Sequence, residues 1–144
     1  MNGIPIDQLN IGDKASFSKT LSESDVYLFA GITGDFNPAH VNETEARKSL
    51  FEGRVAHGML VACFLSTVVG MQLPGPGSIL VRQELKFLAP ARIGDTVNAE
   101  VEVLEIHPRR NMVILGAIVT NQDGRKVIQG KAVVKPPLKK GYEV

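Results

Sequence analysis

The segment Gly34–His40, which reads Gly-Asp-Phe-Asn-Pro-Ala-His, places a carboxylate and an imidazole five residues apart. A carboxylate beside an imidazole fixes one ring tautomer and tunes the basicity of the ring, so such a pair can transfer protons near neutral pH. Pro38 disfavours a helical conformation at Asn37 and makes a rigid corner between the two groups. Asp35 and His40 are therefore candidates for acid/base chemistry, and an ordinary surface loop is the alternative interpretation.

A helix is predicted just before this segment. Ser22 followed by Asp25 is typical of a capping box and places the helix start there. The helix should end between Gly31 and Gly34, where glycine interrupts the pattern. Residues 35–40 are then expected to form an ordered loop that does not continue the helix.

A second helix is predicted from Gly58 to Gly70, where the chain is apolar on nearly every face except for Ser66 and Thr67. A helix of this kind is expected to be buried all round. It is well short of the roughly 20 residues that span a bilayer, so we expect a core helix and no membrane segment. Cys63 lies within it and is interpreted as a core residue.

The chain after Gly77 has the character of β-strands, because polar and apolar residues alternate with a period of two. The dipeptide Asp123-Gly124 is a hairpin signal between the last two runs. The expected strands cover residues 14–20, 82–87, 97–103, 112–120 and 126–135. An antiparallel sheet curled around one apolar helix is an α+β domain. Such a sheet leaves an open edge, so a homodimer is expected.

Composition limits the possible functions of this chain. Its 144 residues, of which 44% are hydrophobic and 22% charged, describe a single domain over residues 1–144. Sixteen basic and fifteen acidic residues give no field that would attract nucleic acid. Residues 1–10 lack the pattern of a signal peptide, which favours a cytoplasmic setting.

Two segments of the chain resemble the two signatures of the MaoC-like, (R)-specific enoyl-CoA hydratases. They are residues 27–40 and the run Arg-Val-Ala-His-Gly-Met-Leu at residues 54–60, and the resemblance extends nearly end to end. It implies the hot-dog fold, in which an antiparallel sheet wraps a long central helix. The sequence departs from the family at Ala39, where larger aliphatic residues are common, and at Asn42-Glu43, where Asp-Pro often occurs. These departures bear on pocket shape and acyl preference.

The resemblance implies a hydro-lyase that adds water reversibly to trans-2-enoyl-CoA and gives (R)-3-hydroxyacyl-CoA. It implies that Asp35 and His40 together hold one water and deliver its elements to the same face of the double bond. Asn37 lies between them and can both donate and accept hydrogen bonds, so it could orient the water or the pair. The sequence does not say which of Asp35 and His40 is the base.

The helix that follows the second signature offers further candidates. The backbone amide of Gly58 is an unsatisfied donor at the positive end of the helix dipole, and it suits a thioester oxygen. By resemblance Ser66 lies near the active site, and Val69 limits the acyl tail. In the alternative interpretation Gly58 only permits a tight turn and Ser66 bonds to its own helix. His57 is interpreted as a structural residue that orients the loop.

Neither a metal nor a nucleotide cofactor is predicted, because no cluster of ligand residues or glycine-rich phosphate loop is visible in the sequence. Two other functions stay open for the same fold: an acyl-CoA thioesterase, and a non-catalytic module that binds acyl-CoA or acyl-carrier protein. Arg54, Arg82 and Lys86 are available cations for the phosphates of such a ligand, although surface cations often serve only solubility.

Overall fold

The computed structural model describes residues 2–138. Short 3-10 turns cover Ile6–Gln8 and Pro108–Arg110. The main elements, in chain order, are β1 (Lys14–Thr20), α1 (Glu23–Thr33), α2 (Pro38–Val41), α3 (Glu43–Ala46), α4 (Gly58–Met71), β2 (Ile79–Phe87), β3 (Thr96–His107), β4 (Met112–Thr120) and β5 (Lys126–Lys135).

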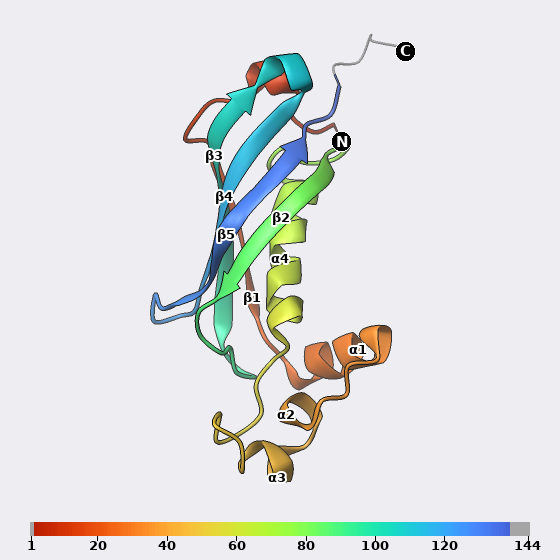
Figure 1. The fold of residues 1–144 in the computed structure, drawn as a ribbon, viewed down its shortest axis with the longest axis vertical. Coiled ribbons are helices and arrows are strands. Elements are labelled where there is room, and N and C mark those ends of the chain that lie inside the picture. Colours follow the sequence, from red (N-terminus) through yellow and green to blue (C-terminus); the bar gives the residue numbers. More distant parts are fainter. Residues whose placement is uncertain (1, 139–144) are drawn as a thin grey trace.

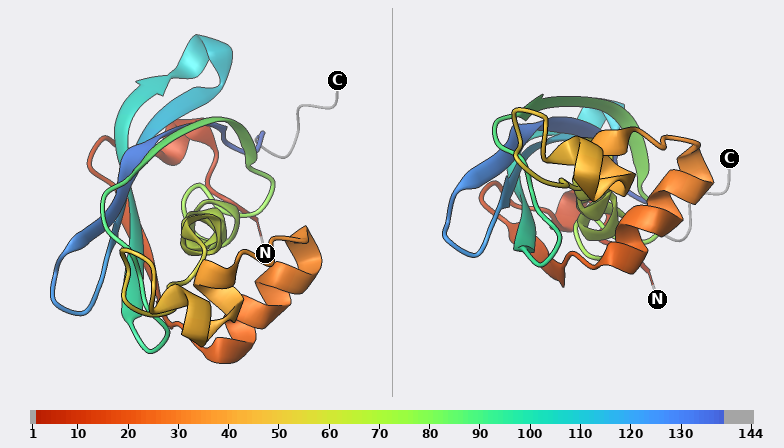
Figure 2. Two further views of the ribbon diagram at one scale, coloured as in Figure 1. Left: turned by 60° about the horizontal axis from the view of Figure 1, so that its bottom comes forward. Right: turned by 90° about the horizontal axis from the view of Figure 1, so that it is seen from below.

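All five strands form one antiparallel sheet in the order β1-β3-β4-β5-β2. The sheet curls around α4, and the three short or peripheral helices α1, α2 and α3 gather beyond the N-terminal end of α4 (Figures 1 and 2). The α+β prediction and the hot-dog arrangement are thereby confirmed. The loop between α3 and α4 brings the chain from this helical group to the start of the central helix (Figure 1).

The core lies between α4 and the concave face of the sheet. Every second residue is buried in β4 and in residues 96–103 of β3, and in β3 this follows the alternation of polar and apolar residues in the sequence. From α4, Leu65 and Val68 are completely buried against them. The buried residues of the two strands are Val97, Ala99, Val101, Val103, Val113, Leu115, Ala117 and Val119.

The other side of α4 is exposed, and the prediction of a helix buried all round is wrong. Met59 and Met71 are 59% and 61% exposed, and Ser66 is exposed as well. Cys63, interpreted as a core residue, is also exposed. The reason is geometric, since a single sheet covers only one side of a helix that it wraps. None of the helices in the described range has the length and apolar character needed to cross a membrane.

Strand β2 differs from the half-buried strand that its alternation predicted. It occupies an edge of the sheet and pairs only with β5, so one row of its backbone groups has no neighbouring strand. Of its nine residues only Leu85 is partly buried. Ile79, Val81 and Phe87 are each more than half exposed, which makes this edge strongly apolar.

The predicted capping box of α1 is present. Ser22 Oγ accepts from Asp25 N at 3.1 Å, and the Asp25 carboxylate accepts from Ser22 N at 2.9 Å. The helix ends at Gly34, whose φ of 78° lies in the left-handed region that glycine adopts without strain. Helix start and end therefore follow directly from residue types.

The segment after Gly34 is only partly a loop, which corrects the prediction for residues 35–40. Pro38 begins the single helical turn α2, and Asn37 caps it by accepting from Ala39 N at 3.0 Å. Proline suits the first position of a helix because its missing N–H is not needed there. His40 consequently stands on a helical turn and not on an extended loop.

Candidate active site

Asp35 is held by a series of tight turns between α1 and α2. Its backbone N–H donates to Thr33 Oγ1 at 3.2 Å, and its Oδ1 accepts from the backbone N–H of Asn37 at 3.1 Å. The side chain is otherwise exposed. These short-range bonds fix the direction of the carboxylate without neutralising its charge. Asn37 thus orients Asp35 through its backbone, while its own side chain caps α2.

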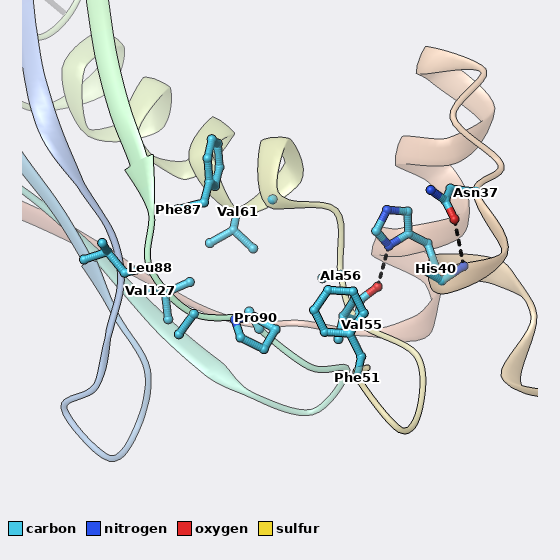
Figure 3. Close-up of a pocket in the computed structure, with 14 residues that line it drawn as sticks. Asn37, His40, Phe51, Val55, Ala56, Val61, Phe87, Leu88, Pro90 and Val127 are labelled. Carbon is cyan, nitrogen blue, oxygen red and sulfur yellow. Dashed lines mark hydrogen bonds between the residues drawn. The ribbon is translucent and has the colours of Figure 1, made fainter. Parts of the chain in front are cut away.

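His40 is oriented by the segment that precedes α4. Its Nδ1 lies 2.7 Å from the carbonyl oxygen of Val55, as Figure 3 shows. A carbonyl oxygen can only accept, so Nδ1 carries the proton. In the neutral ring Nε2 is then left as the basic nitrogen. The two signatures meet here, because the backbone of one fixes the tautomer of the histidine in the other.

His57 completes a group with Asp35 and His40 that the sequence did not reveal. A ligand atom from each of the three residues lies within 4.8 Å of the other two. The rings of His40 and His57 stack with centroids 3.8 Å apart and planes inclined by 32°. We call Asp35, His40 and His57 the histidine cluster.

The histidine cluster has the composition of a metal site. Each ring uses one nitrogen on a backbone carbonyl: Val55 for His40, and Asp35, at 2.9 Å, for His57. Histidines that bind metals make the same kind of bond through their second nitrogen. The expectation that no metal is used stays a prediction.

A pocket of about 480 Å³ opens beside the histidine cluster, between the α2–α4 region and the ends of β2 and β5 (Figure 3). It brings together three of the predicted site residues, Asn37, His40 and Gly58. The wall is otherwise apolar, as expected of a site for an acyl chain. The other lining residues are Ala39, Phe51, Val55, Ala56, Val61, Phe87, Leu88, Ala89, Pro90, Ala91 and Val127.

Gly58 stands where α4 begins, at the edge of the pocket. The preceding residue gives no side-chain cap, so the first N–H groups of the helix stay available as donors at the positive end of its dipole. A Cβ at Gly58 would lie 2.9 Å from Cδ1 of Phe87. Glycine is therefore required for the aromatic ring to lie this close to the helix start.

The structure does not bring Ser66 and Val69 to this pocket. Ser66 lies two turns along α4 on the exposed side, and Val69 is only 7% exposed within the core. Their proposed roles are untested by this single chain. Instead Val61, which is three residues after Gly58 and so on the same helical face, lines the pocket. That spacing could have identified Val61 from the sequence.

Phe87 and Val127 were also missed as pocket residues. Phe87 is the last residue of β2 and Val127 is the second residue of β5. The side chains meet at the pocket because β2 and β5 are paired neighbours in the sheet. No local pattern in the sequence could predict this contact, since it depends on sheet order.

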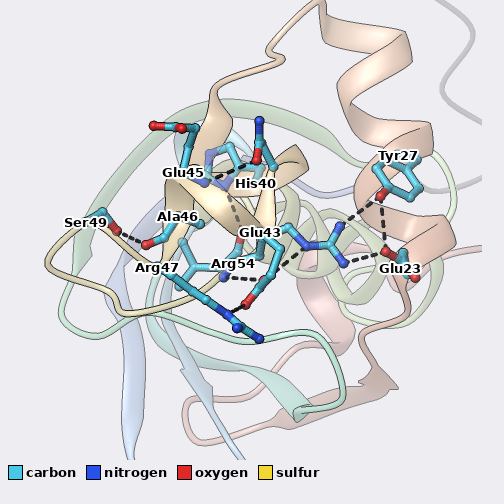
Figure 4. A network of polar contacts seen from close by, with 11 residues as sticks. Glu23, Tyr27, His40, Glu43, Glu45, Ala46, Arg47, Ser49 and Arg54 are labelled. Carbon is cyan, nitrogen blue, oxygen red and sulfur yellow. Dashed lines mark hydrogen bonds and ion pairs between the residues drawn. The ribbon is translucent and has the colours of Figure 1, made fainter.

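A second polar cluster forms around Arg54, in the segment that leads into α4. It consists of Glu23, Tyr27, Glu43 and Arg54 (Figure 4). We call it the arginine cluster. Arg54 pairs with Glu23, donates to Tyr27 Oη at 2.9 Å, and lies 3.5 Å from Glu43. The hydrogen bond from Arg54 lowers the pKa of Glu23, and that of Glu43 is lowered chiefly by Arg47.

The arginine cluster joins α1, α3 and the segment before α4. Because the Arg54 side chain is only 15% exposed and is engaged in these bonds, it is not available for ligand phosphates as the sequence suggested. Arg82 is paired with Glu84, but its side chain is 69% exposed, so its role toward ligand phosphates stays a prediction. The expectation is corrected for Arg54 alone.

Comparison with known proteins identifies relatives over almost the whole chain. The model of the MaoC like domain matches residues 8–124. An (R)-specific enoyl-CoA hydratase of Rhodospirillum rubrum is 50% identical, with 92% of both chains covered. A 3-hydroxybutyryl-CoA dehydratase of Methylorubrum extorquens is 43% identical, with 92% of this chain and 84% of the other covered.

Solved structures agree with the sequence comparison. Unliganded R-hydratase PhaJ1 from Pseudomonas aeruginosa superposes with a TM-score of 0.90 at 39% identity, covering 95% of this chain and 88% of the other. The two signatures, the fold and these relatives lead to one assignment. The chain belongs to the family of MaoC-like domain proteins.

Proposed function

We propose that this protein is an (R)-specific enoyl-CoA hydratase, which adds water reversibly to trans-2-enoyl-CoA. One observation carries the proposal: His40, with Nδ1 engaged by Val55, lines the same apolar pocket as the start of α4 and lies beside Asp35. A proton-handling pair, an apolar cavity and free backbone donors are what hydration of an unsaturated thioester requires. The names of relatives that are 50% and 43% identical support the same activity.

The chemistry starts with a water held between Asp35 and His40. Ligand atoms of the two side chains lie within 4.8 Å of each other, a separation that one water can bridge. One group takes a proton from the water while its oxygen bonds to C3, and the other donates a proton to C2 as the double bond is lost; transfer of a proton between the two groups then restores the pair. Both additions take place on one face of the double bond, and attack of the oxygen on the appropriate face of C3 gives the (R)-3-hydroxyacyl product.

Charge that develops on the thioester oxygen needs donors at a fixed position. We assign this role to the backbone N–H of Gly58, which lies at the start of α4 next to the pocket. Preorganised donors of this kind are typically worth about 3 kcal/mol in the transition state. The acyl chain would then extend along the apolar wall that includes Val61, Phe87 and Val127.

We further propose that the protein works as a homodimer. The edge of β2 and the exposed side of α4 both carry apolar side chains that the described residues leave largely uncovered, with Val81 at 53% and Met59 at 59% exposure. A second copy that covers these surfaces would also cover Ser66, whose predicted place near the active site requires such a neighbour. Light scattering after size-exclusion chromatography tests this, and a monomer at micromolar concentration contradicts it.

The activity itself is tested with crotonyl-CoA, whose enoyl thioester absorbance falls when water adds. We expect this absorbance to fall when the wild-type protein is added. Chiral analysis should then identify the (R)-3-hydroxy product. No change with any acyl length contradicts the proposal. Release of free thiol from a saturated acyl-CoA would indicate a thioesterase, and tight binding without turnover a non-catalytic module.

We place the activity in the cytoplasm, where the exposed free thiol of Cys63 stays reduced.

A further inference from the structure

His57 is a buried polar residue whose side chain makes no hydrogen bond to the helix that it precedes. It is 2% exposed and stands at the N-cap of α4 without capping it. Its Nε2 lies 2.9 Å from the carbonyl oxygen of Asp35, which can only accept, so Nε2 carries the proton. Its buried Nδ1 has no hydrogen-bond partner in the described part of the chain.

The same ring is packed against His40. Their centroids are 3.8 Å apart, and Phe29 of α1 contacts His57 with a centroid separation of 4.9 Å. His40 is therefore fixed twice: the bond to Val55 sets its tautomer, and the stacked ring blocks rotation on one face.

We propose that His57 is a positioning residue for the catalytic pair. It holds the main chain at Asp35 through its Nε2–H and the imidazole of His40 through stacking, and so sets the separation of the two groups. It does not itself transfer a proton. This inference rests on the proposed function, since it assigns the reaction to Asp35 and His40.

Two substitutions separate the two contacts. His57→Gln places an amide N–H at about the position of ring Nε2 and so keeps the donor to Asp35, but it removes the stacked ring. His57→Phe keeps an aromatic ring against His40 and removes the donor. Neither side chain can act as a general acid or base. Val68→Ala, in the same helix but buried in the core away from the pocket, is the matched control for lost packing.

We expect each substitution to lower kcat by about 10- to 100-fold with KM within about three-fold, because a displacement of about 1 Å in a catalytic group has effects of this size. The Val68→Ala control should keep kcat per folded molecule. Wild-type kcat in both His57 variants overturns the inference. So does a loss confined to KM. Equal losses above about 1,000-fold in both variants, with one limb of the pH profile gone, would make His57 a proton carrier and also overturn it.

A readout independent of turnover keeps this test separate from the proposed function. In NMR spectra the ring protons of His40 should be shifted upfield by the stacked ring of His57. The shift should disappear in His57→Gln and persist in His57→Phe, whether or not crotonyl-CoA is hydrated. A His40 spectrum that is unchanged by His57→Gln rules out the stacking contact. If the wild-type protein is inactive but its His40 ring protons show the expected shifts, that result contradicts the proposed function and leaves the stacking contact in place.

Discussion

The arginine cluster and the histidine cluster both contain residues of the segment that leads into α4, and they differ in how their polar side chains are paired. In the arginine cluster Arg54 forms ion pairs with Glu23 and Glu43 and donates to Tyr27, although its buried Nε has no hydrogen-bond partner among the described residues. In the histidine cluster, Nδ1 of His57 has no partner among the described residues. His40 uses Nδ1 in a hydrogen bond to the backbone, and its Nε2 stays available at the pocket.

Under the proposed function, this difference separates groups that hold elements of the fold together from groups that act on the substrate. Paired charges join α1, α3 and the segment before α4. A side chain that uses one polar atom in a hydrogen bond and keeps a second one free is oriented and can still react. Changes in the two clusters should therefore have separable effects.

The largest effect is expected from the histidine cluster. Asp35→Asn or His40→Ala should lower kcat at least about 100-fold, because each removes a general acid or base. The melting temperature should change little, since Asp35 is exposed and His40 is only partly buried. Steady-state kinetics with crotonyl-CoA and thermal denaturation measure both quantities. A variant that keeps nearly the full rate would remove that residue from the catalytic pair.

The reverse pattern is expected from the arginine cluster. Arg54→Met keeps much of the apolar stem and leaves Glu23 and Glu43 without their shared cation. We expect the melting temperature to fall by about 5 °C, while kcat per folded molecule stays within about three-fold. Arg47→Met is the control, because Arg47 contacts only Glu43 of this cluster and its side chain is 72% exposed. A loss of kcat without a loss of stability would contradict the division of roles.

A smaller effect is expected at the cap of α1, which carries Glu23 and Tyr27 of the arginine cluster. Ser22→Ala removes the acceptor for Asp25 N, and loss of such a cap costs about 1 kcal/mol. Urea denaturation measures the change in the free energy of unfolding. Ser24→Ala, an exposed serine in the first turn, should change it by less than about 0.5 kcal/mol. Equal effects at both positions would count against the capping box.

The smallest effect is expected from pH acting on Asp25. The backbone N–H of Ser22, which donates to the carboxylate, lowers the pKa of Asp25, and the ion pair with Lys19 contributes. Because the folded state holds this proton less readily than the unfolded chain, the contribution is present above about pH 4. It is lost as the pH falls through the lowered native pKa. Unfolding by urea at pH 7 and pH 3 should show a stability difference between wild type and Asp25→Ala that shrinks on acidification.

Elements whose causes are local could be predicted from the sequence. The Ser22–Asp25 capping box, the glycine that ends α1, and the strands at residues 14–20, 112–120 and 126–135 all occur as expected. Each depends on residues a few positions apart. The family was recognised because its two signatures are also local patterns.

Features that depend on tertiary arrangement could not be predicted in this way. Hydropathy made α4 look buried all round, yet the sheet covers only one side, and Cys63 is exposed. Alternation in β2 predicted a buried face, but edge position leaves the strand exposed. The stacking of His57 on His40 joins residues 17 positions apart, and no spacing rule predicts it.

Five consecutive residues before and at the start of α4 do four different tasks: Arg54 ties α1 and α3 to this segment, Val55 sets a tautomer, His57 stacks, and Gly58 offers an amide. Such a stretch has almost no tolerance for a change in length. One inserted or deleted residue would turn each later side chain away from its partner, and all of the contacts beyond that point would fail together. Protein engineers who change the part of the apolar wall that lies outside this stretch should transfer residues 54–58 as an uncut unit.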